Sequence, residues 1–213
     1  MGSALAGRGD LGRTEAVSGS APTPLLLAST SPQRRAILGQ LGIPFSVARP
    51  RYVEKDAPEA DPIALVRAHA LGKARSLASE AANRPVLGVD TAVLLDGQVF
   101  GKPFDESEAR AMLAHLAGRT HEVISGLCLI GPGWEELGHE ITRVTFRELS
   151  AREIDVYLAG DEWRGRAGAY AIQGLGARQV ARIEGDYLNV VGLPAALLVS
   201  ILARRFPGVY GLG

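Results

Sequence analysis

Residues 25–41 of the 213-residue chain read LLLASTSPQRRAILGQL, which joins a short apolar run to an amphipathic segment. The run Leu25–Ala28 is typical of a buried strand. The polar elbow Ser29-Thr30-Ser31 follows, and it ends in a residue suited to a helix N-cap before a proline at the first helical position. The next ten residues place three large apolar side chains on one helical face: Ile37, Leu38 and Leu41. The stretch predicts a strand, an elbow and a helix, the unit from which an α/β protein is built.

Two arginines make this helix start unusual. Arg34 and Arg35 lie in the first turn, where the positive end of the helix dipole disfavours a cation by very roughly 0.3–1 kcal/mol, and no acid completes a capping box. One bound anion, most simply a phosphate chain, would reconcile the arginines with the hydroxyls and free N–H groups. A surface elbow with solvated arginines is an equally weighted alternative. On the anion-site interpretation, removal of Arg34 should leave the fold intact.

The composition is that of an ordinary globular chain, with 46% hydrophobic and 22% charged residues. Its length suffices for one core or two small lobes. Lys and Arg together number 23, as do Asp and Glu, so neither a nucleic-acid surface nor a membrane surface is indicated. No apolar run approaches the roughly 18 residues of a membrane helix. The single cysteine, Cys128, lies in an apolar run, which predicts a core thiol and a reducing, cytoplasmic location.

Residues 1–23 differ from the rest of the chain. They are rich in Gly, Ala and Ser, and they carry two acids beside two arginines without an apolar segment, so they resemble neither a secretory signal nor a good transit peptide. We expect a disordered tail, which a start codon placed too early would explain equally well. The folded domain is expected to span 24–207.

A carboxylate interrupts one of the most apolar stretches of the chain. The run Val86–Leu95 predicts a central strand, and Asp90 lies inside it. Because an isolated buried charge is costly, Asp90 must be paired, protonated or bound to a metal. A structural aspartate satisfied by backbone donors remains the alternative. Asp96-Gly97 then predicts a tight hairpin turn into the next strand.

Periodicity and capping signals predict the remaining elements. We expect further strands at 44–48, 98–100, 123–130, 140–147 and 179–183, and helices at 62–79, 104–117, 151–158 and 194–204. Lys73 falls on the apolar face of the second helix, which alone would more often indicate a snorkelling lysine. The four histidines show neither ligand spacing nor a paired nucleophile, so histidine-dependent zinc or triad chemistry is not supported.

Taken together, the motifs resemble those of the Maf family, nucleotide pyrophosphatases also called septum formation proteins. The elbow reads Ser-x-Ser-Pro-x-Arg-Arg-x-x-Leu, as in that family. Later stretches fit in the family's order and spacing: GKAR (72–75), GVDT (88–91), GKP (101–103), AGAYAIQG (167–174) and NVVGLP (189–194). The resemblance implies a Maf or inosine-triphosphatase-like fold, with a mixed twisted sheet flanked by helices and two lobes around a central cleft.

The resemblance also implies an activity and a set of site residues. Family members hydrolyse nucleoside triphosphates to the monophosphate and pyrophosphate. Asp90 takes the position of the proposed general base and, with Glu54, that of the ligands of a divalent cation, for which oxygen ligands favour Mg²⁺ or Mn²⁺. Phosphate-binding positions are Ser29, Ser31, Arg34, Lys73 and Lys102. Specificity positions are Gln33, Thr91 and Gln173.

Substrate choice is the least determined property. Thr91 and Gln173 resemble the branch that prefers dTTP and UTP, and the Gln173 amide offers the donor and acceptor that a pyrimidine edge requires. Gln33 replaces the Arg or Trp of characterised branches, and Arg166 replaces a usual lysine. Two alternatives remain: a 7-methyl-GTP pyrophosphatase, and a nucleotide-binding regulator of cell division without significant catalysis. The expected partner is a nucleoside triphosphate rather than nucleic acid or membrane, and a homodimer is left open.

Overall fold

A computed structural model describes residues 23–55 and 61–212 of the protein. The expected N-terminal tail therefore lies outside the described residues, apart from Thr23. Within the described ranges the strands are β1 Leu25–Ala28, β2 Phe45–Ala48, β3 Val86–Leu95, β4 Gln98–Phe100, β5 Thr120–Gly131, β6 Trp134–Phe146 and β7 Val180–Glu184. The α-helices are α1 Pro32–Gln40, α2 Pro62–Ala78, α3 Glu106–Leu116, α4 Ala151–Leu158, α5 Tyr187–Val191 and α6 Ala195–Arg205. Two short 3₁₀ turns, Ala167–Ala169 and Leu175–Gln179, lie between α4 and β7.

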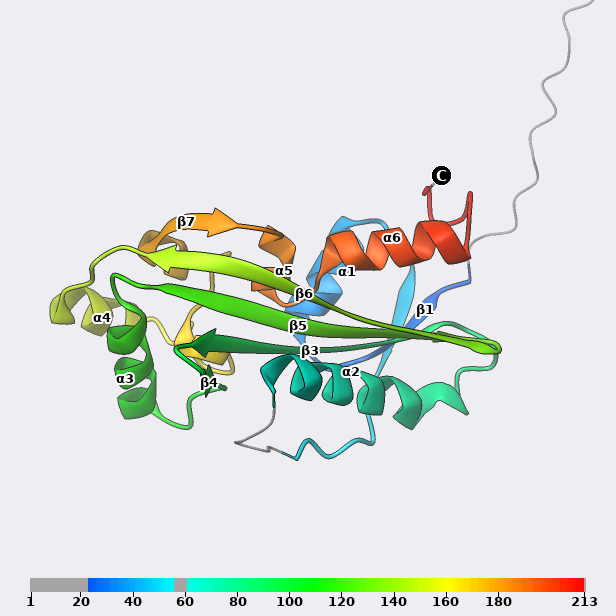
Figure 1. The fold of residues 1–213 in the computed structure, drawn as a ribbon, viewed down its shortest axis with the longest axis horizontal. Coiled ribbons are helices and arrows are strands. Elements are labelled where there is room, and N and C mark those ends of the chain that lie inside the picture. The colour runs from blue at the N-terminus through cyan, green and yellow to red at the C-terminus, as the bar shows by residue number, and fades with distance from the viewer. Residues whose placement is uncertain (1–22, 56–60, 213) are drawn as a thin grey trace, which may run out of the picture.

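The strands form one mixed sheet in the order β2-β1-β3-β5-β6-β7, with β4 paired to β3 (Figure 1). The strands β2, β1 and β3 run parallel, and the other pairs are antiparallel. Parallel neighbours need a crossover, and the chain supplies α1 between β1 and β2 and α2 between β2 and β3. The expectation of an α/β protein with a mixed sheet flanked by helices is confirmed.

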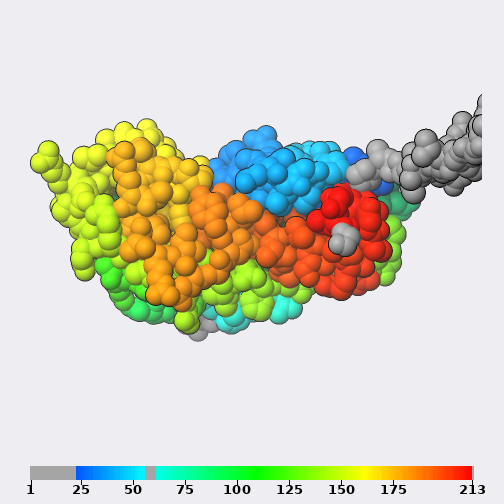
Figure 2. Space-filling view, turned by 90° about the horizontal axis from the view of Figure 1, so that it is seen from above, coloured from blue at the N-terminus to red at the C-terminus, as the bar shows by residue number. Residues whose placement is uncertain are grey.

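One half of the sheet is covered by helices on both faces. Along β1, Leu25 and Leu27 pack toward α1 and α6, whereas Leu26 and Ala28 pack toward α2, as the two-residue period of a strand requires. Each buried side chain of this size contributes roughly 1.5–3 kcal/mol. Figure 1 shows α2 on one face and α6 on the other. Seen from above, the red α6 lies beside the blue and cyan segment that contains α1 and β2 (Figure 2).

The long strands β3, β5 and β6 continue into a second half with its own core. Here α3 and α4 pack near the opposite end of the sheet (Figure 1), and Trp163 and Phe146 are the largest fully buried side chains of this cluster. The first half is closed by the C-terminal segment, where Tyr210 packs against the core and its hydroxyl donates to the Thr23 carbonyl at 2.7 Å. Two clusters on one sheet correspond to the two lobes that the resemblance implies.

Most of the expected elements are present, with differences at their ends. Asp96 and Gly97 have φ angles of 50° and 80°, as a type I′ turn requires, and Ser150 and Glu153 form the capping box of α4. The strands β5 and β6 are longer than expected because their polar residues lie on half-exposed sheet that pairs all the way to the Gly131–Trp134 turn. The short helix α5 was not expected, since five residues carry no helical period.

Candidate active site

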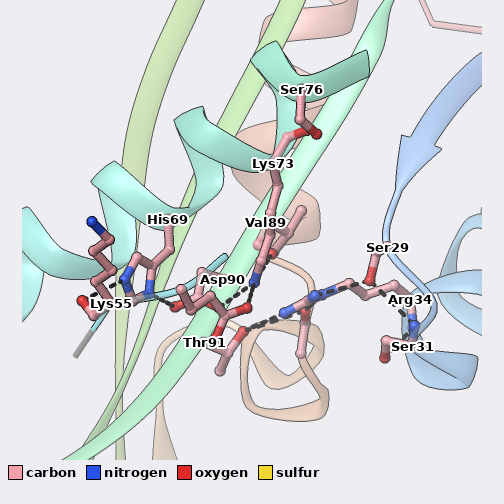
Figure 3. A network of polar contacts seen from close by, with 12 residues as sticks. Ser29, Ser31, Arg34, Lys55, His69, Lys73, Ser76, Val89, Asp90 and Thr91 are labelled. Carbon is pink, nitrogen blue, oxygen red and sulfur yellow. Dashed lines mark hydrogen bonds and ion pairs between the residues drawn. The ribbon is translucent and has the colours of Figure 1, made fainter. Parts of the chain in front are cut away.

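The elbow builds the start of α1 as the sequence predicts. Ser31 has extended backbone angles and its hydroxyl accepts the N–H of Arg34 at 3.5 Å, while the N–H of Ser31 donates to the Ser29 hydroxyl at 3.2 Å. Pro32 occupies the first helical position. The Ser31 hydroxyl in turn donates to the Gln33 side chain at 2.9 Å. These hydrogen bonds fix the elbow, and the side chains of Ser29 and Ser31 lie beside that of Arg34 (Figure 3).

The guanidinium of Arg34 links three parts of the chain. It donates to the Gly192 carbonyl at 2.9 Å, to the Ser29 hydroxyl at 3.0 Å and to the Thr91 hydroxyl at 3.3 Å. Burial lowers the pKa of Arg34, and the carboxylates of Asp90 and Glu54 oppose that effect; an arginine keeps its charge throughout. The expectation that Arg34 is dispensable for the fold follows from the helix dipole alone and stays untested. These three hydrogen bonds argue instead that Arg34 also contributes to stability.

Asp90 is paired with a buried lysine. The ammonium of Lys73 lies 2.6 Å from Asp90 Oδ1 and 2.6 Å from Glu54 Oε1, and it approaches the Val89 carbonyl at 3.5 Å. The side chains of Lys73 and Asp90 are 9% and 15% exposed, whereas that of Glu54 is 49% exposed. Lys73 therefore does not snorkel to solvent. The three formal charges sum to one negative charge, and the guanidinium of Arg34 is a further cation that both carboxylates influence.

Close packing of α2 on the sheet brings Lys73 to Asp90. A side chain at Gly88 of β3 would collide with the α2 backbone at Ala70, and one at Gly126 of β5 would collide with it at Val66. Glycines at these two positions therefore let the helix approach the strand that carries Asp90. The segment before Glu54 is fixed in a similar way, because the Tyr52 ring occupies the space beside Gly72.

His69 is a site residue that the sequence did not reveal. It lies one turn before Lys73 on α2, is 3% exposed, and places Nδ1 3.3 Å from Asp90 Oδ2. Its Nε2 lies 3.4 Å from the Lys55 carbonyl, and the Tyr52 ring is tilted against it. Figure 3 shows His69 and Lys73 reaching Asp90 from the same helix. The available signal was the four-residue spacing to Lys73, which puts both side chains on one helical face.

The other end of the cleft is more open. Lys102, just after β4, and Gln173, in the glycine-rich segment after α4, are both exposed. Neither side chain forms a hydrogen bond or ion pair within residues 23–55 and 61–212. The two loops are joined where the Gly168 N–H donates to the Gly101 carbonyl at 3.1 Å. Nearby, the buried Nε of Arg166 has no partner in the described chain.

Thr91 points away from Asp90 along β3, as alternation requires. Its hydroxyl lies 2.9 Å from that of Ser125, the residue opposite it on β5, and accepts the Arg34 bond. Thr91 therefore helps to hold the Arg34 side chain in the cleft.

A single cleft of about 570 Å³ collects all of these side chains. Its lining contains every residue that the sequence and the resemblance assign to the site: Ser29, Ser31, Gln33, Arg34, Glu54, Lys73, Asp90, Thr91, Lys102 and Gln173. It also contains residues that were not expected there: His69, Tyr170 and Gly192. Residues from both halves of the sheet meet in it, so the cleft lies between the two lobes.

The donors present fit a divalent cation. Glu54, His69 and Asp90 each offer one ligand atom, and these atoms lie within 4.8 Å of one another. Two carboxylates and an imidazole form a set that several divalent metals accept. The set is fixed on one side by the buried His69 and Asp90, while the exposed Glu54 can adjust.

Comparison with known proteins identifies the family. The Maf-like protein family matches residues 24–205, most of the chain. This protein therefore belongs to the Maf family.

Individual relatives agree with that placement. The chain is 46% identical over 192 residues to a dTTP/UTP pyrophosphatase of Nitratidesulfovibrio vulgaris, covering 87% of this chain and 90% of the relative. It is also 46% identical over 189 residues to a dTTP/UTP pyrophosphatase of Moorella thermoacetica, covering 88% and 97%.

Among solved structures, the Staphylococcus aureus Ham1 protein aligns with a TM-score of 0.41 at 11% identity, covering 58% of this chain and 71% of that one. No helix in the described ranges is long and apolar enough to cross a membrane.

Proposed function

We propose that this protein is a nucleoside triphosphate pyrophosphatase that hydrolyses dTTP and UTP to the monophosphate and pyrophosphate. Relatives called dTTP/UTP pyrophosphatases, 42–46% identical over most of the chain, support the activity and the substrates. The observation that carries the proposal is the largely buried Asp90, which pairs with Lys73 and lines the same cleft as the Arg34 elbow. A carboxylate beside a turn that can bind an anion suits hydrolysis of a phosphoanhydride.

In this proposal Asp90 is the general base. It accepts a proton from a water whose oxygen forms a bond to the α-phosphorus, and the bond from that phosphorus to the α,β-bridging oxygen breaks as pyrophosphate leaves. Lys73 donates to Asp90 Oδ1 at 2.6 Å and so orients the carboxylate. The general base is worth about 10²-fold to 10⁴-fold in rate.

The phosphate chain is assigned to the elbow end of the cleft. Ser29, Ser31 and the first N–H groups of α1 would donate to phosphate oxygens, and Arg34, Lys73 and Lys102 would neutralise the leaving pyrophosphate. Arg34 is positioned for this by hydrogen bonds that it makes without substrate, so little ordering is needed on binding. The exposed Lys102 has to be ordered when the substrate arrives.

Glu54 and Asp90 are proposed to hold a divalent cation, Mg²⁺ or Mn²⁺. When bound, such a cation supplies electrostatic stabilisation of charge on the phosphate oxygens. The excess negative charge of Glu54 and Asp90 over Lys73 supports this assignment. Lys73 would share the carboxylates with the cation rather than be displaced.

Base recognition is assigned to the open end of the cleft. The Gln173 amide can donate to and accept from the edge of a uracil or thymine. Gln33 is fixed by Ser31 and lies where the phosphate end meets the rest of the cleft. A 7-methylguanine carries a positive charge, and the cation Arg166 in the lining of this cleft disfavours it.

The alternative, a nucleotide-binding regulator without significant catalysis, predicts no pyrophosphate release from any nucleotide; the pyrophosphatase names of the relatives favour the enzyme. We place the reaction in the cytoplasm, in keeping with the buried free thiol of Cys128.

Pyrophosphate release from a nucleotide panel with purified protein tests the proposal. The panel is dTTP, UTP, CTP, ATP, GTP and 7-methyl-GTP, compared by kcat/KM. We expect dTTP and UTP to be cleaved fastest. Preference for a purine would contradict the substrate assignment, and no pyrophosphate from any nucleotide would contradict the enzyme.

A further inference from the structure

We propose that His69 is a third ligand of the divalent cation, so that the site prefers a cation that accepts imidazole nitrogen, such as Mn²⁺, over Mg²⁺. The proposal rests on the cation site of the proposed function, and it adds a nitrogen ligand to the two carboxylates.

The separation of the two buried atoms fits a shared ion. His69 Nδ1 and Asp90 Oδ2 lie 3.3 Å apart. Adjacent ligands that bind one octahedral cation at 2.0–2.2 Å are about 3 Å apart. Glu54 completes a set within 4.8 Å, and reaching the spacing of adjacent ligands requires its exposed side chain to move by up to about 2 Å.

The surroundings of the His69 ring also favour a role as a metal ligand. Both ring nitrogens face an acceptor, Asp90 Oδ2 at one side and the Lys55 carbonyl at the other. A neutral imidazole carries only one N–H, so one nitrogen presents its lone pair to an oxygen. Histidine ligands of metals commonly donate the second N–H to a backbone carbonyl, which here assigns the N–H to Nε2 and leaves Nδ1 for the ion.

Asp90 divides its two oxygens between two cations in this arrangement. Oδ1 accepts from Lys73, and Oδ2 lies on the His69 side. Adding a dication changes the formal charge of Glu54, Lys73 and Asp90 from one negative to one positive, which favours a polyanionic substrate. The neutral His69 adds affinity without altering that balance.

The chemistry of the ligands sets the preference. Mg²⁺ takes oxygen ligands and keeps several waters, whereas imidazole suits transition metals and raises their relative affinity. Losing a first ligand should cost at least as much as losing a supporting residue, which is about 10-fold to 100-fold in metal affinity.

The experiment measures Mn²⁺ and Mg²⁺ binding to the metal-free full chain by calorimetry without nucleotide. The variants are His69→Leu and His69→Asn, with His139→Leu, an exposed histidine on β6, as the matched control. Pulsed electron paramagnetic resonance of bound Mn²⁺ reports directly on a ¹⁴N ligand. Thermal melts establish that each variant is folded.

We expect the wild type to bind Mn²⁺ more tightly than Mg²⁺ and to show a histidine ¹⁴N coupling. Both His69 variants should lose the coupling and at least about 10-fold in Mn²⁺ affinity, with Mg²⁺ changed far less, while His139→Leu behaves as wild type. Unchanged Mn²⁺ affinity in both variants overturns the proposal. Equal losses for the two metals would make His69 a positioning residue for Asp90 and also overturn it, as would a wild type that binds no Mn²⁺. Pyrophosphate release from dTTP with Mg²⁺ tests the proposed function independently.

Discussion

The two ends of the cleft are built differently. At the elbow end, Arg34 and Lys73 are each held by several partners, and Asp90 is largely buried. At the other end, Lys102 and Gln173 are exposed and, within the described ranges, their side chains have no partner. The side chains at the elbow end are therefore held in place without substrate, whereas those of Lys102 and Gln173 have no such contacts within the described ranges.

This difference separates chemistry from substrate choice. Groups that carry a reaction benefit from preorganisation, because no reorganisation is then needed in the transition state. Groups that read a base can change with little consequence for the fold when they lie exposed on a loop. Changes at the elbow end should therefore affect rate and stability together, whereas a change at Gln173 should affect selectivity alone.

The largest effect is expected at Asp90. Asp90→Asn removes the base and one cation ligand but keeps the shape, so turnover of dTTP should fall by at least about 10²-fold. Asp96→Asn, in the exposed hairpin turn, is the matched control and should retain full activity. Pyrophosphate release under saturating dTTP is the readout, and a variant that keeps most of its turnover would remove Asp90 from the chemistry.

Arg34 should couple binding to stability. Arg34→Ala leaves the Gly192 carbonyl and two hydroxyls without their charged donor, at a cost of about 2 kcal/mol in unfolding free energy. The KM for dTTP should rise as well. Urea unfolding of Arg34→Ala beside Arg35→Ala, whose side chain is exposed, measures the difference. Equal stability of the two variants would mean that the elbow is not a structural link.

The free energy of unfolding should fall in acid because of a buried histidine beside the cleft. His121 is buried and bonded to Tyr170 of the cleft wall at 2.9 Å, and burial lowers the pKa of His121 to about 4. Below its usual pKa of about 6.5, the unfolded chain takes up a proton that the folded chain refuses, so stability falls as the pH drops from there toward 4.

By pH 5 the expected loss from His121 is about 2 kcal/mol. Urea unfolding at pH 7 and pH 5 should therefore show a smaller pH effect in His121→Gln than in the wild type. His139→Gln, which changes an exposed histidine, should keep the full effect. A pH effect identical in all three proteins would be inconsistent with a neutral, buried His121.

The smallest effect is expected at Gln173. Gln173→Ala should narrow the preference for dTTP over ATP by about tenfold, since an unmet polar group on the buried base edge costs roughly 1–3 kcal/mol. The exposed side chain has no partner in the described structure to lose, so unfolding free energy should not change. The ratio of kcat/KM values for dTTP and ATP tests this prediction. An unchanged ratio would mean that the base is recognised elsewhere in the cleft.

Local patterns were sufficient for much of the fold. The elbow predicted the cap and helix of α1, and the apolar run around Asp90 predicted β3 with a charge that needed a partner. The resemblance supplied what local patterns lack, the strand order and the convergence of distant motifs. All ten expected site residues line the cleft, while their individual roles remain proposals.

What the sequence missed depends on contacts between distant segments. The Gly192 carbonyl that accepts a hydrogen bond from Arg34 lies 158 residues further along the chain, so no local pattern predicts this contact. His69 gives no ligand spacing with another histidine, because its neighbours in the site come from a loop and from β3. In the sequence, Gly88 and Gly126 look like ordinary strand glycines. Their role in close packing is visible only once α2 lies against the sheet.

The central claim is that water attacks the α-phosphorus of a nucleoside triphosphate in this cleft. Hydrolysis of dTTP in ¹⁸O-labelled water, followed by mass spectrometry of the products, tests it most directly. The account predicts one ¹⁸O atom in dTMP and unlabelled pyrophosphate. Label in inorganic phosphate with dTDP as the other product, or label in pyrophosphate, would contradict it.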